Sequence, residues 1–233
     1  MHVDVAFTPD EAGAAPTGIV VDVIRATSTI CQTLAAGTSR VYCTGEVEDA
    51  RALRESLGAG VLGGERKAVR IPGFDLGNSP AEYVERLDAP LILTTTNGTR
   101  AILAAAERCN RVLVGSLLNL GALGEAARSA GDDVLVVCAG VQGTLALDDA
   151  FVAGRIAELL GSTRTDAAEA AVRLAGTWNG AEDAFRASKS GRNLLENAPE
   201  LEPDITFCAR ESVLDVVPRL VGMRDGAAEV ALG

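Results

Sequence analysis

The side chains best suited to chemistry gather in residues 63–80, which read GGERKAVRIPGFDLGNSP. This stretch shows neither helical nor strand periodicity, and it carries Glu65, Arg66, Asp75 and Asn78 among glycines and prolines. Long irregular segments of compact domains are uncommon, and those that occur are usually binding or active-site loops. Carboxylates and guanidinium groups together suit a hard cation and an anionic ligand. We therefore predict an irregular functional loop, the alternative being an ordinary solvated connection.

Further polar residues follow apolar runs that are typical of buried strands. Asp22 and Arg25 lie at the end of the β-branched run 19–23, and residues 94–99 (TTTNGT) follow another such run. The hydroxyls and backbone N–H groups of 94–99 stand at the predicted start of a helix, which favours phosphate or sulfonate binding. Ordinary helix capping is the alternative. Arg25 could bind an oxyanion, or it could pair with Asp22 or Asp149 and only shape the site.

The chain lacks residues that several common enzyme classes need. His2 is the only histidine, which excludes a Ser-His-Asp triad and histidine-ligated zinc centres. There is no Gly-Lys-Ser/Thr of a P-loop, and no cysteine has an arginine six positions later, as a cysteine phosphatase needs. Ile24 stands where an aspartyl-phosphate loop starting at Asp22 would carry its second aspartate. Residues 58–63 match a dinucleotide fingerprint but follow a predicted helix instead of a strand.

Carboxylates are the metal ligands that remain. Mg²⁺ prefers oxygen ligands, takes one or two carboxylates and keeps several waters. Asp148 and Asp149 open a predicted helix, so they could reach such a metal, or they could only complement the helix dipole. The residue types therefore favour a hard cation and an anionic substrate.

Strands and helices alternate along most of the chain, which is the pattern of a parallel sheet covered by helices. We predict one domain over residues 1–233, of the α/β class, folded as a three-layer α/β/α sandwich with a largely parallel sheet. Ligands of such sheets bind beyond the carboxyl ends of the strands. The predicted strands are 2–7, 19–23, 40–44, 91–93, 111–115, 133–138, 204–208, 213–217 and 229–232. The predicted helices are one that follows an N-cap at Thr27 or Ser28 and ends at Ala36, then 46–57, 80–87, 100–109, 118–130 and 148–160, with two more helical segments in 161–200.

Composition limits the partners. The net charge is −11, the pI is about 4.6 and aromatic residues make up 3% of the chain, so a nucleic acid partner is disfavoured. Five cysteines are scattered without a CxxC pair, which predicts buried reduced thiols. No signal peptide and no membrane span is visible. We expect a cytoplasmic protein that binds a small anionic substrate, and an Ala/Val/Leu-rich surface helix could form a homodimer.

Several blocks together resemble the successive motifs of the 2-phosphosulfolactate phosphatase family. The resemblance covers roughly the whole chain in order, and the GFDLGNSP and TTTNGT blocks are its most specific parts. Weaker similarity continues through residues 190–194, Asp204 and 217–218. The main blocks are DVIRAT (22–27), GER (64–66), IPGFDLGNSP (71–80), TTTNGT (94–99), GS (115–116) with Asn119, and CAG (138–140).

The resemblance implies a Mg²⁺-dependent phosphatase that hydrolyses 2-phospho-3-sulfolactate to 3-sulfolactate and phosphate, a step toward coenzyme M. It implies roles for residues in each block. Asp22 and Glu65 would coordinate Mg²⁺ or activate water, Asp149 matches a further acid that could bind the metal, and Arg25 and Arg66 would hold the phosphate or the sulfonate. Asp75 and Asn78 would position the substrate or the residues that contact it, and an anionic group would be held by Thr96, Asn97, Gly98 and Thr99.

The chain departs from the family pattern at two places. Asp148 stands where Glu is expected, and Lys67-Ala68 stands where Gly or Asn is more frequent. Another small phosphorylated hydroxy acid could be the substrate, and a non-catalytic binding protein for an acidic metabolite is a further alternative. A covalent aspartyl-phosphate at Asp22 also stays open. All of these hypotheses require Asp22, Glu65 and Asn97 to meet in one cleft.

Overall fold

The computed structural model describes residues 1–161 and 163–233, and eleven strands of this part form one mixed sheet. The strands are β1 (His2–Ala6), β2 (Ala15–Val21), β3 (Val41–Thr44), β4 (Val61–Arg66), β5 (Val69–Arg70), β6 (Leu91–Thr94), β7 (Cys109–Gly115), β8 (Val134–Cys138), β9 (Thr163–Arg164), β10 (Arg219–Arg224) and β11 (Ala227–Ala231). Their order across the sheet is β5-β4-β6-β3-β11-β10-β7-β2-β8-β1-β9.

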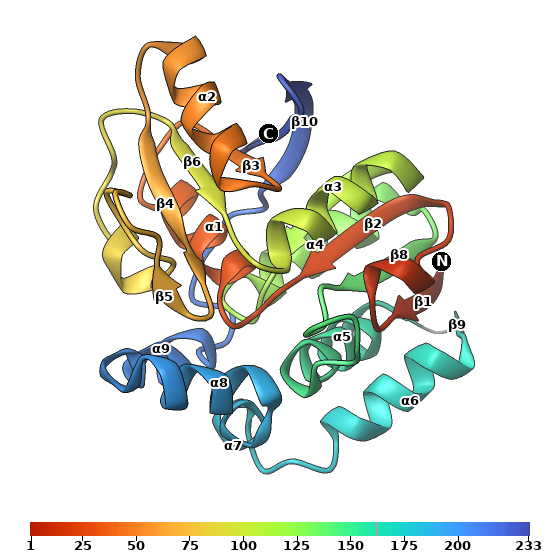
Figure 1. Ribbon diagram of the computed structural model, residues 1–233. Helices are drawn as coiled ribbons and strands as arrows, with labels where there is room; N and C mark the ends of the chain where they lie inside the picture. Colours follow the sequence, from red (N-terminus) through yellow and green to blue (C-terminus); the bar gives the residue numbers. More distant parts are fainter. Residues whose placement is uncertain (162) are drawn as a thin grey trace.

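Nine α-helices of the described residues surround this sheet (Figure 1). They are α1 (Ala26–Ala35), α2 (Val47–Leu57), α3 (Gly98–Arg108), α4 (Leu120–Ala130), α5 (Leu147–Leu160), α6 (Asp166–Ala175), α7 (Ala181–Ala187), α8 (Lys189–Asn197) and α9 (Pro203–Cys208). Three 3₁₀ turns accompany them: Pro9–Glu11, Pro80–Tyr83 and Pro199–Leu201.

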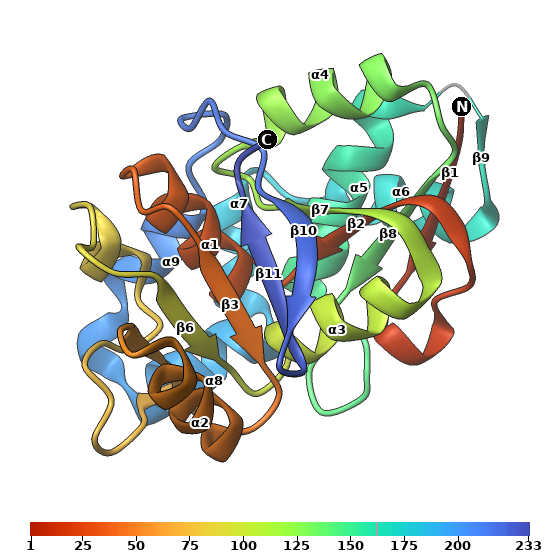
Figure 2. The ribbon, with the colours of Figure 1, turned by 90° about the horizontal axis from the view of Figure 1, so that it is seen from above.

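The sheet consists of two parallel groups joined by an antiparallel hairpin. Strands β4, β6 and β3 run parallel to one another, as do β7, β2, β8, β1 and β9. The C-terminal hairpin β10–β11 pairs antiparallel with β7 on one side and with β3 on the other. Figure 2 shows this hairpin between the two groups. The last segment of the chain therefore joins the two parallel groups of strands into one sheet.

Side-chain alternation along the strands produces three hydrophobic clusters. In β2, Ile19 and Val21 face α4, α5 and α6, whereas Val20 faces α1 and α3. Tyr42 of β3 and Ile92 of β6 pack against α2 in the third cluster. Both faces of the sheet are thus covered by helices, which confirms the predicted three-layer α/β/α sandwich with a mostly parallel sheet.

Strand ends from both groups meet near one group of helices. Val21 at the end of β2 pairs with Gly115 of β7 and Cys138 of β8, so these strands end together. Figure 1 shows the carboxyl ends of β2 and β4 turned toward α7, α8 and α9 at the bottom of the view. The fold therefore brings loops of distant sequence to one edge.

The prediction of a wholly irregular loop over residues 63–80 is wrong. Its first part belongs to β4 and β5, which form a hairpin with Glu65 opposite Arg70. The sequence does not indicate this strand, because Gly63 and Gly64 have no side chains that could form the alternating apolar and polar pattern of a strand. A Cβ on Gly64 would lie 2.0 Å from the carbonyl oxygen of Thr94 in the neighbouring strand. Tertiary contact with β6, and not the local pattern, therefore sets this strand.

Three further predictions fail near Pro80 and in the C-terminal segment. The predicted helix 80–87 is only the 3₁₀ turn Pro80–Tyr83, and the predicted strand 204–208 is the helix α9, which Pro203 begins in the position that proline favours. Residues 213–217 contain no strand, whereas Arg219–Arg224 forms β10, which the sequence analysis missed. None of the described helices is long and apolar enough to cross a membrane.

Candidate active site

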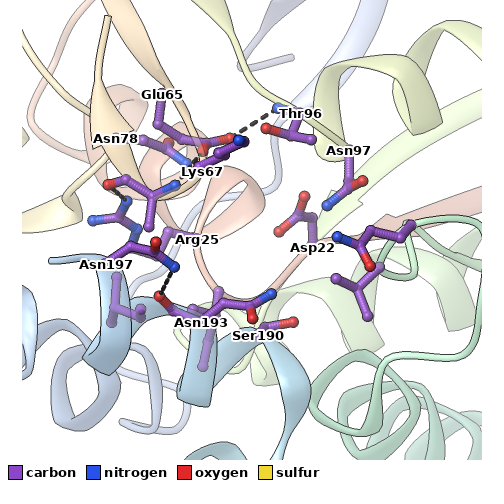
Figure 3. Close-up of a pocket in the computed structure, with 15 residues that line it drawn as sticks. Asp22, Arg25, Glu65, Lys67, Asn78, Thr96, Asn97, Ser190, Asn193 and Asn197 are labelled. Carbon is purple, nitrogen blue, oxygen red and sulfur yellow. Dashed lines mark hydrogen bonds between the residues drawn. The ribbon is translucent and has the colours of Figure 1, made fainter.

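A cavity of about 230 Å³ opens at the edge where the strand ends meet, and Figure 3 shows its lining. Six residues predicted for the site line it: Asp22, Arg25, Glu65, Asn78, Thr96 and Asn97. Exposure divides the lining into two parts. The floor is buried and comprises Asp22, Arg25, Glu65 and Asn78. The rim is exposed and comprises Lys67, Thr96, Gln142 and Asn197.

Asp22 stands one residue beyond β2, and the N-terminus of α3 packs directly against it. A Cβ on Gly98 would lie 2.6 Å from Oδ2 of Asp22, so only glycine allows this approach. Burial raises the pKa of Asp22 to about 7, and the charges of Asp148 and Glu65 add to the rise, while the Ala26 amide acts in the opposite direction. Asp22 is therefore poised between its protonated and ionised forms near neutral pH.

Asp149 joins two strand ends from the first turn of α5. Its Oδ1 accepts a hydrogen bond from the Val23 N–H and its Oδ2 accepts one from the Gly140 N–H, both at 3.0 Å. Burial and the charges of Asp148 and Asp22 raise its pKa well above the usual range. Asp149 does not line the cavity, so its contact with a metal stays a prediction, and its observed contacts fix the ends of β2 and β8.

Asp148 is buried and stands in the same turn as Asp149. Neither of its carboxylate oxygens has a hydrogen-bond partner among the described residues. Burial raises its pKa to about 6, and the nearby hydroxyls of Ser188 and Ser190 act in the opposite direction. We call Asp22, Asp148 and Asp149 the acid cluster. Because a buried carboxylate without a hydrogen-bond partner is costly when it is ionised, Asp148 favours either its protonated form or a nearby cation.

Glu65 connects β4 to the loop before α3. Its Oε1 accepts the Thr96 N–H and its Oε2 accepts the Ala68 N–H, both at 2.8 Å. The neighbouring Arg66 points elsewhere: its guanidinium donates to the carbonyls of Glu65 and Gly45 and to the Thr94 hydroxyl. Arg66 lies outside the cavity lining, so a direct role in catalysis stays a prediction, and its visible contacts hold the end of β4.

Arg25 is anchored by a buried ion pair. Its Nη1 donates to Oδ2 of Asp204 at 2.8 Å, and Oδ1 of Asp204 accepts the Ser79 hydroxyl at 2.6 Å. Its Nη2 donates to the Ala68 carbonyl at 2.8 Å. We call Arg25, Asp204 and Ser79 the Arg25 cluster. These bonds fix the guanidinium at the cavity floor, where it can meet one side of an anion.

Asn78 presents a free acceptor at the floor. Its backbone carbonyl accepts the Thr29 hydroxyl at 2.8 Å, whereas its side-chain Oδ1 is buried with no hydrogen-bond partner among the described residues. An orphaned buried oxygen needs a donor or a cation. The side chain of Asn78 is therefore available to a ligand.

The TTTNGT block is divided between the cavity and the helix cap. Thr96 and Asn97 line the cavity. Thr99 instead exchanges hydrogen bonds with Thr95 through both hydroxyls and stabilises the turn. Asp75 lies outside the lining as well: it accepts the Leu62 N–H at 2.8 Å and pairs with Arg54. The substrate contacts predicted for Gly98, Thr99 and Asp75 therefore stay predictions.

Two tight turns at the rim place polar side chains over the cavity. Lys67 and Ala68 connect β4 to β5 with φ values of 55° and 68°, and Gln142 and Gly143 form a similar turn with φ values of 54° and 72°. Positive φ at both central residues defines a type I′ turn, which favours Asn-Gly. Each non-glycine residue there costs roughly 1 kcal/mol. Lys67 and Gln142 thus occupy backbone positions that do not suit them.

One wall of the cavity was not predicted from the sequence. It is lined by Ser190, Asn193, Leu194 and Asn197 of α8. Their spacing of three and four residues places them on one face of the helix, but no local signal tells that this face meets Asp22. Only the weak similarity at residues 190–194 pointed to this segment.

The oxygens of the site fit a hard cation. The described residues contain no cluster of three His, Cys, Asp or Glu side chains placed to hold a metal, but Mg²⁺ needs only one or two carboxylates because waters and substrate supply the rest. Asp22 and Glu65 both line the cavity. The Oδ1 of Asn78, which lines the same cavity and has no hydrogen-bond partner among the described residues, is a further oxygen that could meet a cation.

Comparisons with known proteins match nearly the whole chain to one family. A family model described as 2-phosphosulpholactate phosphatase matches residues 6–222. Three similar proteins, each named probable 2-phosphosulfolactate phosphatase, come from Carboxydothermus hydrogenoformans, Synechococcus sp. and Thermotoga maritima. The first is 34% identical over 224 residues, covering 94% of this chain and 92% of the relative. The second is 38% identical over 227 residues (92% and 93%), and the third 37% over 223 residues (94% and 95%).

Proposed function

Because this chain belongs to the 2-phosphosulfolactate phosphatase family, we propose that it hydrolyses 2-phospho-3-sulfolactate to 3-sulfolactate and inorganic phosphate with the help of Mg²⁺. One observation carries the proposal. Asp22, Arg25, Glu65 and Asn97 come from separate blocks of the sequence and line one cavity. Acids, a fixed guanidinium and a helix N-terminus in one cavity suit a phosphate ester and a hard cation.

Asp22 is the residue that handles the proton. Water attacks phosphorus, a new P–O bond forms, and the P–O bond to the lactate oxygen breaks. The ionised carboxylate of Asp22 takes a proton from the attacking water, and the departing alkoxide takes a proton from solvent water. His2 is the only histidine and does not line the cavity, so we assign this role to a carboxylate.

The other floor residues orient the ester. Arg25, held by Asp204, donates to phosphoryl oxygens. The amide nitrogen of Asn78 and the N-terminus of α3 add donors around the same group. Asp22 and Glu65 would hold Mg²⁺, which when bound supplies positive charge against the developing negative charge of the phosphoryl group. The acid cluster alone would repel a phosphate, so the cation also makes binding favourable.

The cellular setting follows from the resemblance. The proposed reaction is a step toward coenzyme M. The cytoplasm is the proposed compartment, because all five cysteines are free, buried thiols and such thiols persist where the environment is reducing.

A phosphate-release assay tests the proposal. The purified protein is incubated with 2-phospho-3-sulfolactate and with other phosphorylated hydroxy acids, such as 2-phospholactate and 3-phosphoglycerate, each with Mg²⁺ or with EDTA. We expect phosphate release that is fastest with 2-phospho-3-sulfolactate and that EDTA abolishes. Faster release from another ester would assign a different substrate, EDTA resistance would remove the metal, and no release from any ester would leave a binding protein.

A further inference from the structure

We propose that Lys67 is a specificity-determining residue that binds an acid group of the substrate other than the phosphate, namely its sulfonate or carboxylate. This inference rests on the proposed function, because it concerns the same cavity. Lys67 lies at the tip of the β4–β5 hairpin and lines the cavity beside Glu65 and Thr96 (Figure 3).

The depth of the cavity separates Lys67 from the reacting phosphate. Asp22 is only 8% exposed and stands at the floor, so the phosphate must enter deeply to reach it. Lys67 is exposed and stands at the rim. A substrate with its phosphate at the floor and its other acid groups a few bonds away directs those groups toward the rim.

The backbone conformation at the tip of the β4–β5 hairpin indicates that the Lys67 side chain has a functional role. Asn-Gly is the pair that suits a type I′ turn, yet lysine and alanine occupy it with positive φ. The turn is held by two of the charged floor residues, since Glu65 accepts the Ala68 N–H and Arg25 donates to the Ala68 carbonyl. Backbone strain that surrounding contacts maintain is typical of functional positions.

The charge of Lys67 is available to a ligand. Arg25, the other cation of the lining, is paired with Asp204. Lys67 takes part in no ion pair within residues 1–161 and 163–233. Its ammonium on a long flexible stem is a point charge, which accepts a sulfonate or a carboxylate without demanding one orientation. Asn193 and Asn197 of α8 offer amide donors in the same lining.

Two esters separate this role from phosphate binding. The first is 2-phospho-3-sulfolactate, and the second is isopropyl phosphate, which keeps the secondary phosphate ester and lacks both acid groups. We expect Lys67→Asn to raise KM for the first ester about tenfold, as for a lost charged hydrogen bond at a partly exposed site, with kcat changed less than about threefold. The kcat/KM for isopropyl phosphate stays unchanged. Asparagine tolerates positive φ, so this variant keeps the turn.

Two further variants serve as controls. Lys67→Arg keeps the charge and retains the discrimination between the esters, whereas Arg173→Asn removes an exposed cation of α6 and leaves both KM values unchanged. Equal weakening of both esters in Lys67→Asn would assign Lys67 to the phosphate and overturn the proposal. An unchanged KM for both esters would also overturn it.

A binding measurement tests the role of Lys67 independently of turnover. Calorimetric titration with 3-sulfolactate, which carries the sulfonate and the carboxylate but no phosphate, should give a Kd about tenfold higher for Lys67→Asn than for the wild type. If the wild type hydrolyses neither ester, the proposed function fails, and this titration still tests Lys67. Equal affinities of the two proteins, or no binding by the wild type, would overturn the role of Lys67.

Discussion

Two clusters of buried charge lie side by side beneath the same cavity, and they are built in opposite ways. In the Arg25 cluster, opposite charges meet at 2.8 Å and the Ser79 hydroxyl satisfies the second oxygen of Asp204. In the acid cluster, like charges face one another, the pKa values of its members are raised, and both oxygens of Asp148 lack partners among the described residues.

The contrast indicates that the Arg25 cluster fixes the geometry of the site, whereas the acid cluster is available to a ligand. A buried pair whose donors and acceptors are satisfied holds its members in place. Buried acids without counter-charge are unfavourable in the protein alone, so such a cluster persists where a cation or a proton transfer uses it. The four predictions below test this distinction, from the largest expected effect to the smallest.

Asp22→Asn should abolish turnover while leaving the fold intact. Asparagine cannot take a proton and binds a cation weakly, so kcat should fall by at least about 10³-fold. The stability should stay equal or rise, because one of the repelling charges is removed. Phosphate release and urea denaturation measure the two effects, with Asp4→Asn, which changes an aspartate of β1 bonded to Thr165, as control. Near-normal rates would remove Asp22 from the catalytic groups.

Asp204→Ala should destabilise the protein by about 3 kcal/mol, because it leaves the buried guanidinium of Arg25 without its partner. Turnover should also fall, since Arg25 loses its position at the floor. The matched control is Glu202→Ala in the same segment, which removes the ion pair of Arg186 with an exposed Glu202 and should cost less than about 1 kcal/mol. Equal urea midpoints for the two variants would show that Arg25 does not depend on Asp204.

The stability should depend on pH in a direction set by the acid cluster. Asp22 and Asp148 have pKa values of about 7 and about 6 in the folded protein, against about 3.9 when unfolded. The folded state therefore binds more protons between these values, so this contribution is complete below about pH 4 and is lost as the pH rises through 6 and 7.

Comparison with Asp148→Asn isolates this contribution. In EDTA, the wild type should lose on the order of 2 kcal/mol relative to the variant between pH 5 and pH 8, measured by urea unfolding at each pH. Parallel curves for the two proteins would contradict unbalanced charge at Asp148.

Mg²⁺ should stabilise the protein at pH 8, when the acid cluster is ionised. At a free concentration ten times its Kd, a bound cation adds about 1.4 kcal/mol, which corresponds to a rise in Tm of about 3–5 °C for a chain of this size. Asp22→Asn should lose most of the rise, and NaCl at equal ionic strength should not produce it. An equal rise in Asp22→Asn would exclude Asp22 as a ligand.

The sequence predicted the parts of the fold whose signals are local. Strands β2 and β8 were predicted from their apolar runs, and helix α2 was predicted from its amphipathic spacing. Both patterns can be read from a short segment, because the strand and helix periods repeat over a few residues. Asp22, Thr96 and Asn97 were found because strand ends in parallel sheets meet at one edge. These sequence patterns do not depend on which residues line the rest of the cavity.

Other parts depend on neighbours far along the chain. β4 carries two glycines where a strand pattern needs side chains, and contact with β6 defines it. α9 replaces a predicted strand because Pro203 starts a helix and Asp204 is buried against Arg25. The directions of Arg66 and Asp75, which point away from the cavity, also follow from partners that the sequence does not reveal.

The sequence by itself therefore determined the layers, the family and the residue types of the site, because periodicity and motifs are properties of short segments. The tertiary structure alone decided which side chains share the cavity. The hairpin β10–β11 at the end of the chain joins the two parallel groups, and residues of α8 line the same cavity as Glu65 of β4. Contacts between residues more than a hundred positions apart set that arrangement, and no local pattern records them.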